Sequence, residues 1–331
     1  MSELYPLLIQ PEFYARPWGA RDLAPIYPDV KVSEPIGEAW LTGEKCKVAN
    51  GPLAGKTLAE LAREFGRDLV GEAAPQPDRF PLLVKFLFPR EKLSVQVHPD
   101  DEGAKALGEP CGKTECWYVL AAEPGAKVGL GLKPGISKQQ FEQAIRETRA
   151  EELLNWIDIH AGELIYVDAG TVHAIGPGSI LVETQQNSDT TFRLYDYGRP
   201  RELHIEKGLA ATKERTRAGK VTAQLHPSHE NSGHAETLVS AGCFIVERYT
   251  ASEPLPFSTL GEGGRLMQVL VAVSGGGAVE SLRGQDVAFT RGDAVVIPAA
   301  VNSYRVRPQW DLEFLRSLVP MSHVADPAVA F

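Results

Sequence analysis

The stretch from Leu93 to His173 decides the fold, because it holds two short strand-like runs: Leu93-Ser94-Val95-Gln96-Val97-His98 and Gly162-Glu163-Leu164-Ile165-Tyr166-Val167-Asp168-Ala169-Gly170-Thr171-Val172-His173. In the first run, alternation places Gln96 and His98 on one face of a strand. In the second run, a strand ends in an Asp-Ala-Gly turn that delivers His173. Both runs are typical of short β-strands, and each places polar side chains at its end.

Four side chains in these segments are suited to bind a metal ion. Gln96, His98 and His173 come from the two runs, and Glu115 lies in a third strand-like segment between them. Two imidazoles, a carboxylate and an amide oxygen form a nitrogen and oxygen ligand set for zinc or a similar divalent ion. The alternative is that each is an ordinary hydrogen-bonded residue at a strand end. A neutral amide is also a weak ligand, so Gln96 could instead only hydrogen-bond the other ligands.

The same segments resemble a known family. Gly162 to His173 is similar to the second half of a cupin metal motif, and Gln96-x-His98 with Glu115 is similar to the first half. The wider pattern resembles the type I phosphomannose isomerases, in a compact bacterial form, over about the first two thirds of the chain. The segments that carry it are Ser94-x-Gln96-x-His98-Pro99-Asp100-Asp101, Gly112-Lys113-Thr114-Glu115-Cys116-Trp117, Ala169-Gly170-Thr171-Val172-His173-Ala174 and Asp189-Thr190-Thr191-Phe192-Arg193-Leu194-Tyr195-Asp196.

The resemblance implies a fold, an activity and a cofactor. The fold would be mainly β, with two cupin-like jelly-roll β-barrels and a small helical insertion. The activity would be a metal-dependent isomerisation between mannose 6-phosphate and fructose 6-phosphate through a cis-enediol intermediate. One Zn²⁺ per chain, or another divalent ion, would be held by Gln96, His98, Glu115 and His173.

Two further residues are candidates for the catalytic step. Arg193 matches the arginine that the family uses, and a fixed guanidinium can stabilise an enediolate without losing its proton. Its alternative role is a structural ion pair with Asp189 or Asp196. Glu183 is the candidate base, and its alternative role is to hydrogen-bond substrate hydroxyls or the metal ligands.

Three residues are expected to contact the substrate. The resemblance places Ser94, Lys85 and Lys113 around the sugar phosphate. Lys85 lies in the apolar run Pro81 to Phe88, where a lysine is unfavourable unless it faces a cavity or an acid. A cation near a cavity is suited to bind a phosphate or a hydroxyl.

Composition limits the partners. The net charge of −9 argues against nucleic acid and against an anionic membrane surface, since both require basic patches. The four cysteines lack the spacing of a metal site or the density of a disulfide scaffold, so reduced thiols are expected. The N-terminus lacks the basic start of a signal peptide and no long apolar run is present, which predicts a cytoplasmic protein. The partner would be a small sugar phosphate, and the chain a monomer or a small homo-oligomer.

The chain divides into two expected domains. Residues 1–230 would form the catalytic domain, with an amphipathic helical insert at about 137–159 that begins at the N-cap Ser137. Shorter helices are expected from Thr57 to Phe65 and from Glu202 to Lys213. Residues 235–331 would form a second cupin-like β domain without metal ligands. There, Gly292 to Asn302 repeats the pattern of Gly162 to His173, with Asn302 in the position of the histidine.

Two other functions compete with the isomerase. A cupin dioxygenase would use iron with open coordination positions, but the lysines and Arg193 have no evident purpose there. A non-catalytic sugar-binding cupin would keep His98, Glu115 and His173 but would not need Arg193 or a base.

Overall fold

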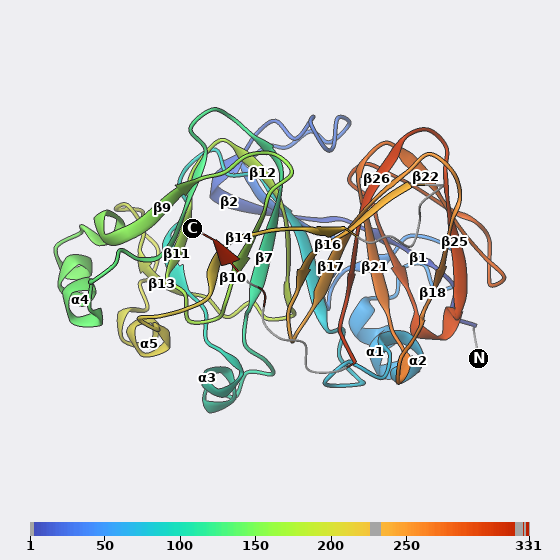
Figure 1. Cartoon of the computed structure of the whole chain (residues 1–331), viewed down its shortest axis with the longest axis horizontal. Helices are drawn as coiled ribbons and strands as arrows, with labels where there is room; N and C mark the ends of the chain where they lie inside the picture. Colours follow the sequence, from blue (N-terminus) through green and yellow to red (C-terminus); the bar gives the residue numbers. More distant parts are fainter. Residues whose placement is uncertain (1–2, 226–232, 322–326, 328, 331) are drawn as a thin grey trace.

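The chain is mainly β, as expected. The computed structural model describes residues 3–225, 233–321, 327 and 329–330. Figure 1 shows two β-rich halves side by side, with the helices at their edges. Each half has two larger sheets, whose strand pairings are antiparallel throughout the described residues. No helix of the described part is long and apolar enough to cross a membrane.

The first half contains an eight-stranded and a five-stranded sheet. The first sheet runs β2 (Glu12–Ala20), β3 (Ile36–Trp40), β5 (Leu82–Leu87), β12 (Ser179–Gln186), β7 (Glu115–Ala122), β10 (Leu164–Val167), β14 (Ala218–Val221) and β27 (Val329–Ala330). The second runs β13 (Phe192–Tyr195), β6 (Val95–Val97), β11 (His173–Ile175), β8 (Lys127–Leu132) and β9 (Leu154–Asp158).

The second half contains another eight-stranded sheet and a four-stranded one. The larger runs β15 (Gln224–Leu225), β16 (Gly233–Ser240), β17 (Ile245–Ala251), β26 (Leu312–Leu318), β21 (Gln268–Ser274), β24 (Ala294–Ile297), β1 (Leu7–Gln10) and β4 (Lys47–Val48). The smaller runs β18 (Leu255–Ser258), β25 (Ser303–Pro308), β22 (Gly276–Ser281) and β23 (Val287–Thr290). A small hairpin pairs β19 (Leu260–Gly261) with β20 (Gly264–Arg265).

A hydrophobic core packs the two sheets of the first half together. It includes Leu87, Trp117 and Leu181 from the larger sheet and Val128 and Ile175 from the smaller one. Side chains two residues apart on a strand share a face. The buried Lys85, Glu115 and Glu183 therefore point to the same interior as this core.

The helices form where capping residues precede an apolar face. The expected helix after Thr57 is α1 (Leu58–Phe65), and the one after Ser137 is α4 (Lys138–Arg146). Both begin with a reciprocal capping box, which satisfies two backbone N–H groups at the helix start. The expected helix near 202–213 is α5 (Ile205–Ala211). The remaining short helices are α2 (Arg67–Val70), α3 (Asp101–Ala106), η1 (Ala150–Leu153) and η3 (Ala299–Val301).

The helical insert is shorter than predicted: only α4 and the short η1 are helical, and the prediction of helix was wrong for Leu154–Asp158. The helix α4 ends at Arg146, and Thr148 then adopts a left-handed backbone with φ 59°. Residues Leu154–Asp158 form β9, which pairs with β8. Leu154 is compatible with a helical pattern and with a strand. Its segment forms a strand because β8 provides the hydrogen-bond partners.

The strand pairings cross the predicted domain boundary. The N-terminal β1 pairs with β24, and the C-terminal β27 pairs with β14 (Figure 1). Each half is therefore completed by a strand from the far end of the chain. The predicted boundary at 230–235 lies partly outside the described residues, and the division into two domains stays a prediction.

The expected internal repeat has a structural counterpart. Gly162 and Gly292 both have positive φ, at 88° and 97°, and each lies two residues before a buried four-residue strand, β10 and β24. In the first copy the chain goes on to His173 at the start of β11. In the second it goes through η3 to Asn302, which has a φ of 70°.

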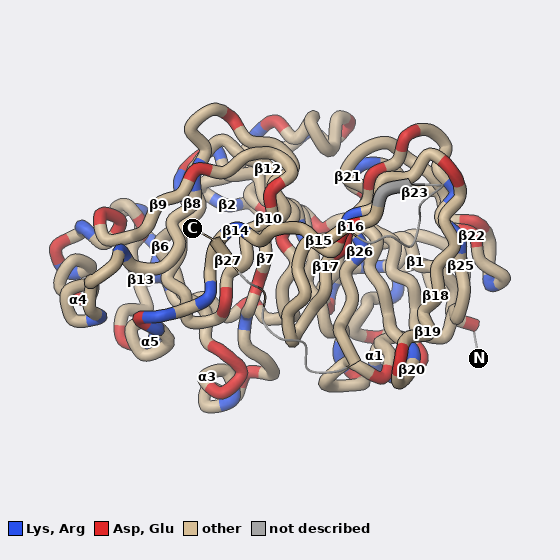
Figure 2. Tube along the Cα trace, viewed as in Figure 1, with Lys and Arg blue, Asp and Glu red and all other residues tan. Residues whose placement is uncertain are grey.

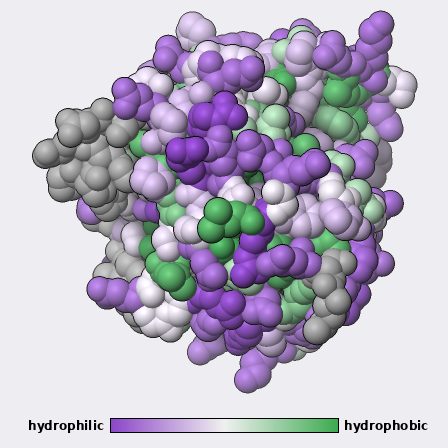
Figure 3. Space-filling view, turned by 90° about the vertical axis from the view of Figure 1, so that its right-hand side faces the viewer, coloured by the Kyte–Doolittle hydropathy of each residue, from purple (hydrophilic) through white to green (hydrophobic). Residues whose placement is uncertain are grey.

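The outer end of the second half is mostly hydrophilic. Figure 3 faces this end and shows its hydrophobic side chains in separate spots. Leu282, which is 97% exposed, and Trp310 are among the exposed large hydrophobic residues of the second half.

Candidate active site

Three of the predicted metal ligands meet in the interior of the first half. His98 follows β6, Glu115 begins β7, and His173 begins β11. Their ligand atoms all lie within 4.8 Å of one another. The Nε2 of His98 is 3.5 Å from one carboxylate oxygen of Glu115, and the Nε2 of His173 is 3.4 Å from the other. All three side chains are buried.

Both imidazoles are oriented by backbone carbonyls. The Nδ1 of His98 lies 3.0 Å from the Thr190 carbonyl, and the Nδ1 of His173 lies 2.9 Å from the Thr171 carbonyl. With Nδ1–H donating to a carbonyl, each ring directs the lone pair of its Nε2 towards Glu115. This arrangement is common in metal-binding histidines, because the second hydrogen bond sets the tautomer and the ring orientation.

Burial keeps the two rings neutral. It is the main cause that holds the pKa of His98 well below its usual range, and the neighbouring Lys113 acts in the same direction. Burial also lowers the pKa of His173 to about 4. Glu115 Oε2 is buried and makes no hydrogen bond to a described group. Two neutral nitrogen donors and a carboxylate fit a divalent metal ion.

Gln96, the fourth predicted ligand, lies beside these three residues. It pairs in register with His173 on one side and with Arg193 on the other. Its amide Nε2 lies 3.1 Å from the Nε2 of His173. A half-turn of the amide would bring its oxygen to that position.

A cavity of about 430 Å³ opens next to these residues. Its lining includes the predicted Lys85, Ser94, Gln96, Lys113, Glu115, Glu183 and Arg193, and also Arg16, Trp18, Glu38, Asp189 and Arg201, which were not predicted as site residues. The Ser94 hydroxyl lies 3.4 Å from Gln96 Oε1. The structure thus collects all of the predicted substrate and catalytic residues around one space.

In space, each of the two predicted lysines lies between acidic side chains. Lys113 Nζ lies 3.0 Å from both His98 Nε2 and Glu115 Oε2, and 3.7 Å from Glu183. Lys85 Nζ lies 3.4 Å from Glu183 and 4.0 Å from Glu38. Both lysines therefore have the acidic partners that a buried ammonium requires.

Glu183 lies between Lys85 and Lys113. Burial is the main cause that raises its pKa, and the nearby Glu115 adds to the effect, while Lys85 and Lys113 oppose it. Its Oε1 is buried and makes no hydrogen bond to a described group. Glu183 is therefore a carboxylate whose proton affinity is higher than usual, and it faces the cavity.

Arg193 does not make the ion pairs that were considered for it. Its Nη1 donates to the Glu202 carbonyl at 2.8 Å, and its buried Nε has no partner among the described residues. Asp196 pairs with Arg199 and Arg201 instead. The guanidinium of Arg193 is thus held at one end and faces the cavity.

Glu38, Arg16 and Arg201 are three of the five cavity-wall residues named above that were not predicted for the site. Glu38 lies in the segment Gly37-Glu38-Ala39-Trp40, where an acid two residues from an aromatic residue, on the same face of a strand, was the available signal. Arg16 had no local signal. Arg201 follows Arg199 and Pro200 in a turn, a setting that is common for ordinary surface arginines.

Comparisons with known proteins agree with this architecture. A family model described as phosphomannose isomerase type I, catalytic domain, matches residues 7–121. The mannose-6-phosphate isomerase of Streptococcus mutans serotype c is 34% identical over 324 residues, which cover 94% of this chain and 98% of that protein. The mannose-6-phosphate isomerase ManA of Bacillus subtilis is 42% identical over 216 residues, which cover 62% of this chain and 67% of that protein.

Solved structures show the same fold. The crystal structure of the mannose 6-phosphate isomerase from Bacillus subtilis has a TM-score of 0.84 at 30% identity, and the match covers 94% of this chain and 99% of that one. A zinc-bound mannose 6-phosphate isomerase structure has a TM-score of 0.74 at 15% identity, with 94% of this chain and 98% of that one covered. At that identity the likeness concerns the fold alone.

Proposed function

The chain belongs to the type I phosphomannose isomerase family, and on that premise we propose that it interconverts mannose 6-phosphate and fructose 6-phosphate. The single observation that carries the proposal is the convergence of His98, Glu115 and His173 beside a cavity lined by charged residues. Family membership also favours the isomerase over the two alternatives, the cupin dioxygenase and the non-catalytic sugar-binding cupin.

The proposed cofactor is one divalent metal ion per chain, with zinc as the first candidate. His98, Glu115 and His173 would hold it, and Gln96 would be a fourth ligand after rotation of its amide. When bound, such an ion supplies Lewis-acid stabilisation of negative charge on the sugar oxygens. The Thr190 and Thr171 carbonyls keep both imidazoles in the orientation that this role requires.

The reaction moves a proton between C1 and C2 of the sugar through a cis-enediol. We assign the base to Glu183, because it faces the cavity and burial raises its pKa towards the range that suits proton transfer. Lys85 and Lys113 flank it and would keep the carboxylate charged between turnovers. Arg193 would stabilise the enediolate through its unpartnered side.

The remaining predicted residues are proposed to contact the substrate. Ser94 lies next to Gln96 on the cavity wall, where its hydroxyl could hydrogen-bond the sugar. The ammonium groups of Lys85 and Lys113 lie among the acids close to the three metal-binding candidates, a position suited to the hydroxyls at the reacting end of the sugar.

We also propose one active centre per chain, in a catalytic domain of residues 1–230. Within the described residues, His98, Glu115 and His173 are the one group of three His, Cys, Asp or Glu side chains close enough to share a metal. Asn302 stands where a second copy would need its histidine. The domain of residues 235–331 would therefore have a structural role.

A coupled assay of the purified chain with mannose 6-phosphate tests this function. We expect turnover that is lost after chelation and is restored by added zinc. His173→Ala should lose both bound zinc and turnover, whereas the control His160→Ala, which removes an exposed histidine, should keep both. Full activity of metal-free protein would remove the metal from the mechanism, and absence of turnover with zinc bound would refute the isomerase.

A further inference from the structure

The outer edge of β13 is completed by a histidine. β13 is the first strand of the five-stranded sheet, and within the described residues no strand pairs with it on the side opposite β6. Figure 2 shows α5 beside β13 at this edge, with charges of both signs on the helix. An edge strand leaves backbone N–H and C=O groups without a strand partner. At Arg193 both groups are instead satisfied by His204, the residue before α5.

His204 contacts the backbone of Arg193 twice. Its backbone N–H donates to the Arg193 carbonyl at 2.7 Å, and its ring Nδ1 accepts the Arg193 N–H at 3.2 Å. The two residues therefore pair like opposite residues of antiparallel strands, with an imidazole nitrogen in the place of a carbonyl oxygen. Because an N–H can only donate, Nδ1 carries the lone pair and the proton of the neutral ring is on Nε2. That Nε2 lies 3.8 Å from Glu202 Oε2.

The same turn also contacts the guanidinium of Arg193. Its Nη1 donates to the Glu202 carbonyl at 2.8 Å, while the buried Nε has no partner among the described residues. The segment 202–204 thus holds Arg193 at three atoms: the backbone nitrogen, the backbone oxygen and Nη1. Since so few contacts fix the guanidinium itself, its direction into the cavity depends on where this turn and the backbone of β13 are placed.

Close packing fixes the start of α5 against β13. Gly208, one turn after His204, donates its N–H to the His204 carbonyl at 2.8 Å. A Cβ at Gly208 would lie 2.5 Å from Leu194 Cδ2 and 3.3 Å from Phe192 Cβ, so the helix approaches both sequence neighbours of Arg193. The rings of Phe192 and His204 also pack edge to face, with centroids 6.3 Å apart. The imidazole is therefore held at a fixed distance from the Arg193 backbone.

We infer that His204 is a positioning residue for Arg193, whose guanidinium it keeps in the place where an enediolate can be stabilised. The inference rests on the proposed isomerase function and deepens it by naming the residue that orients the catalytic arginine. His204 does not line the cavity, so it acts through Arg193. Arg193 acts on charge that develops in the transition state, and its displacement should therefore lower kcat with little effect on KM.

Steady-state kinetics of His204→Leu and His204→Asn test the inference. Leucine fills the space with an apolar side chain that has no acceptor. The Oδ1 of asparagine is bonded to Cγ, as Nδ1 is in histidine, and can accept the Arg193 N–H. We expect His204→Leu to lower kcat roughly tenfold or more, with KM changed less than about threefold. His204→Asn should restore kcat to within about threefold of the wild type, and both variants should bind zinc as the wild type does.

A double-mutant cycle separates positioning from a general loss of structure. If His204 acts through Arg193, then His204→Leu in an Arg193→Ala background should change kcat less than about twofold, because the group that it positions is already gone. The control is Leu209→Ala, which removes packing of α5 and leaves the hydrogen bonds to Arg193 intact. It should lower the midpoint of thermal unfolding and leave kcat within about twofold of the wild type.

The results distinguish this inference from the function on which it rests. A zinc-loaded wild-type chain that does not isomerise mannose 6-phosphate contradicts the proposed function, and normal turnover of Arg193→Ala contradicts the role assigned to that arginine. If both expectations hold but His204→Leu keeps its kcat within about twofold, positioning by His204 alone is overturned. Equal losses of kcat in the leucine and asparagine variants, or independent losses in the double variant, overturn it as well. So does a loss of kcat in Leu209→Ala that equals the loss in His204→Leu.

Discussion

Replacing Lys113 by methionine tests the buried charge network directly. The Lys113 ammonium is 5% exposed and lies 3.0 Å from Glu115, 3.0 Å from His98 Nε2 and 3.7 Å from Glu183. Lys113→Met leaves two buried carboxylates with Lys85 as their nearest cation, which is 3.4 Å from Glu183. Breaking one partner out of a buried ion pair typically costs about 3–5 kcal/mol. Because Glu183 keeps Lys85, we expect about 3 kcal/mol in the metal-free protein.

Urea unfolding in the presence of a chelator measures this loss. Of the five tryptophans, all but Trp310 belong to the first half, so tryptophan fluorescence reports mainly on the half that contains Lys113. Zinc should recover part of the stability of Lys113→Met, since a divalent cation next to Glu115 compensates its charge. The control is Lys127→Met, where the lysine is 49% exposed and 4.0 Å from Asp158, and we expect less than about 1 kcal/mol there. If Lys113→Met unfolds at the same urea concentration as the wild type, the network does not stabilise the fold as argued.

Three further predictions concern the cavity residues. Glu183→Gln should lower kcat by roughly 10²–10⁴-fold with one zinc still bound per chain, and steady-state rates within threefold of the wild type would exclude it as the base. Arg193→Ala should retain zinc and lose most of its turnover, which metal analysis and the coupled assay can separate; a loss of zinc together with activity would indicate a structural role instead. Burial alone would raise the pKa of Glu38, but Lys85 and Arg16 lower it to about 2 from an ordinary 4.5, so its stabilising contribution is complete above that ordinary value and is lost as the pH falls towards 2. The difference in unfolding free energy between wild type and Glu38→Gln should therefore shrink over that pH window, and a constant difference would contradict the assignment.

The sequence was sufficient to predict several of the residues that meet around the cavity, among them Lys85, Lys113 and Glu183. Alternation in short strands places side chains on a known face, and the order of the two half-motifs indicates that His98, Glu115 and His173 converge. The helix starts at Thr57 and Ser137 could also be predicted, because a helix N-cap is a local sequence pattern.

Long-range pairing was the part that local patterns could not predict. Leu154–Asp158 forms a strand because β8 offers it hydrogen bonds, and nothing within the segment indicates that partner. The periodicity of the sequence also does not indicate that β1 pairs with β24 of the second half, or that β27 pairs with β14 of the first half. Arg201 and Arg16 became site residues only because Asp196 and Glu38 fix them at the cavity wall.

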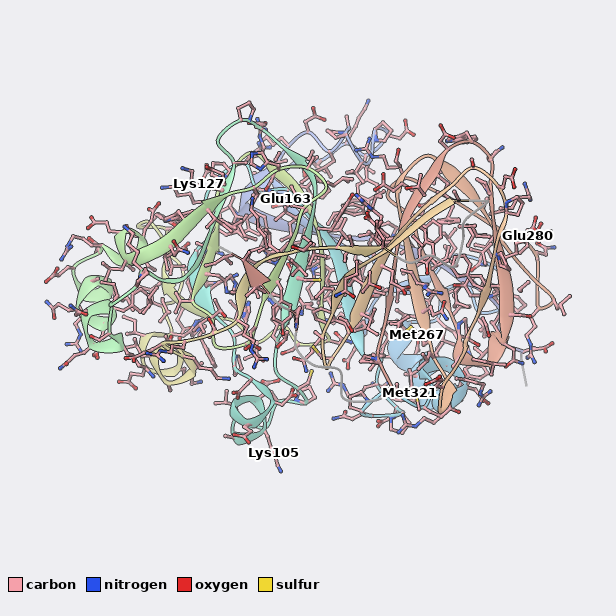
Figure 4. The ribbon with its side chains drawn as sticks, in the orientation of Figure 1. Lys105, Lys127, Glu163, Met267, Glu280 and Met321 are labelled. Carbon is pink, nitrogen blue, oxygen red and sulfur yellow. The ribbon has the colours of Figure 1, made fainter. Side chains whose placement is uncertain are left out.

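The periphery of the molecule contributes little to the site. In Figure 4, Lys105 on α3 points away from the body of the molecule. The side chains of Lys127 on β8 and Glu163 before β10 are 49% and 29% exposed. Glu163 forms an ion pair with Lys220 at 2.7 Å, which links β14 to the segment just before β10. Such partly exposed pairs stabilise the fold weakly, so changes there should leave the cavity residues in place.

Zinc K-edge X-ray absorption of the chain loaded with one equivalent of zinc tests the central claim most directly. The site proposed for His98, Glu115 and His173 predicts a first shell of nitrogen and oxygen only, at about 2.0–2.2 Å, with the outer-shell scattering of two imidazoles. Wild-type spectra should show this shell, and His173→Ala should lose one imidazole or fail to bind zinc. Sulfur scattering at about 2.3 Å would instead place the zinc on cysteines and contradict the account.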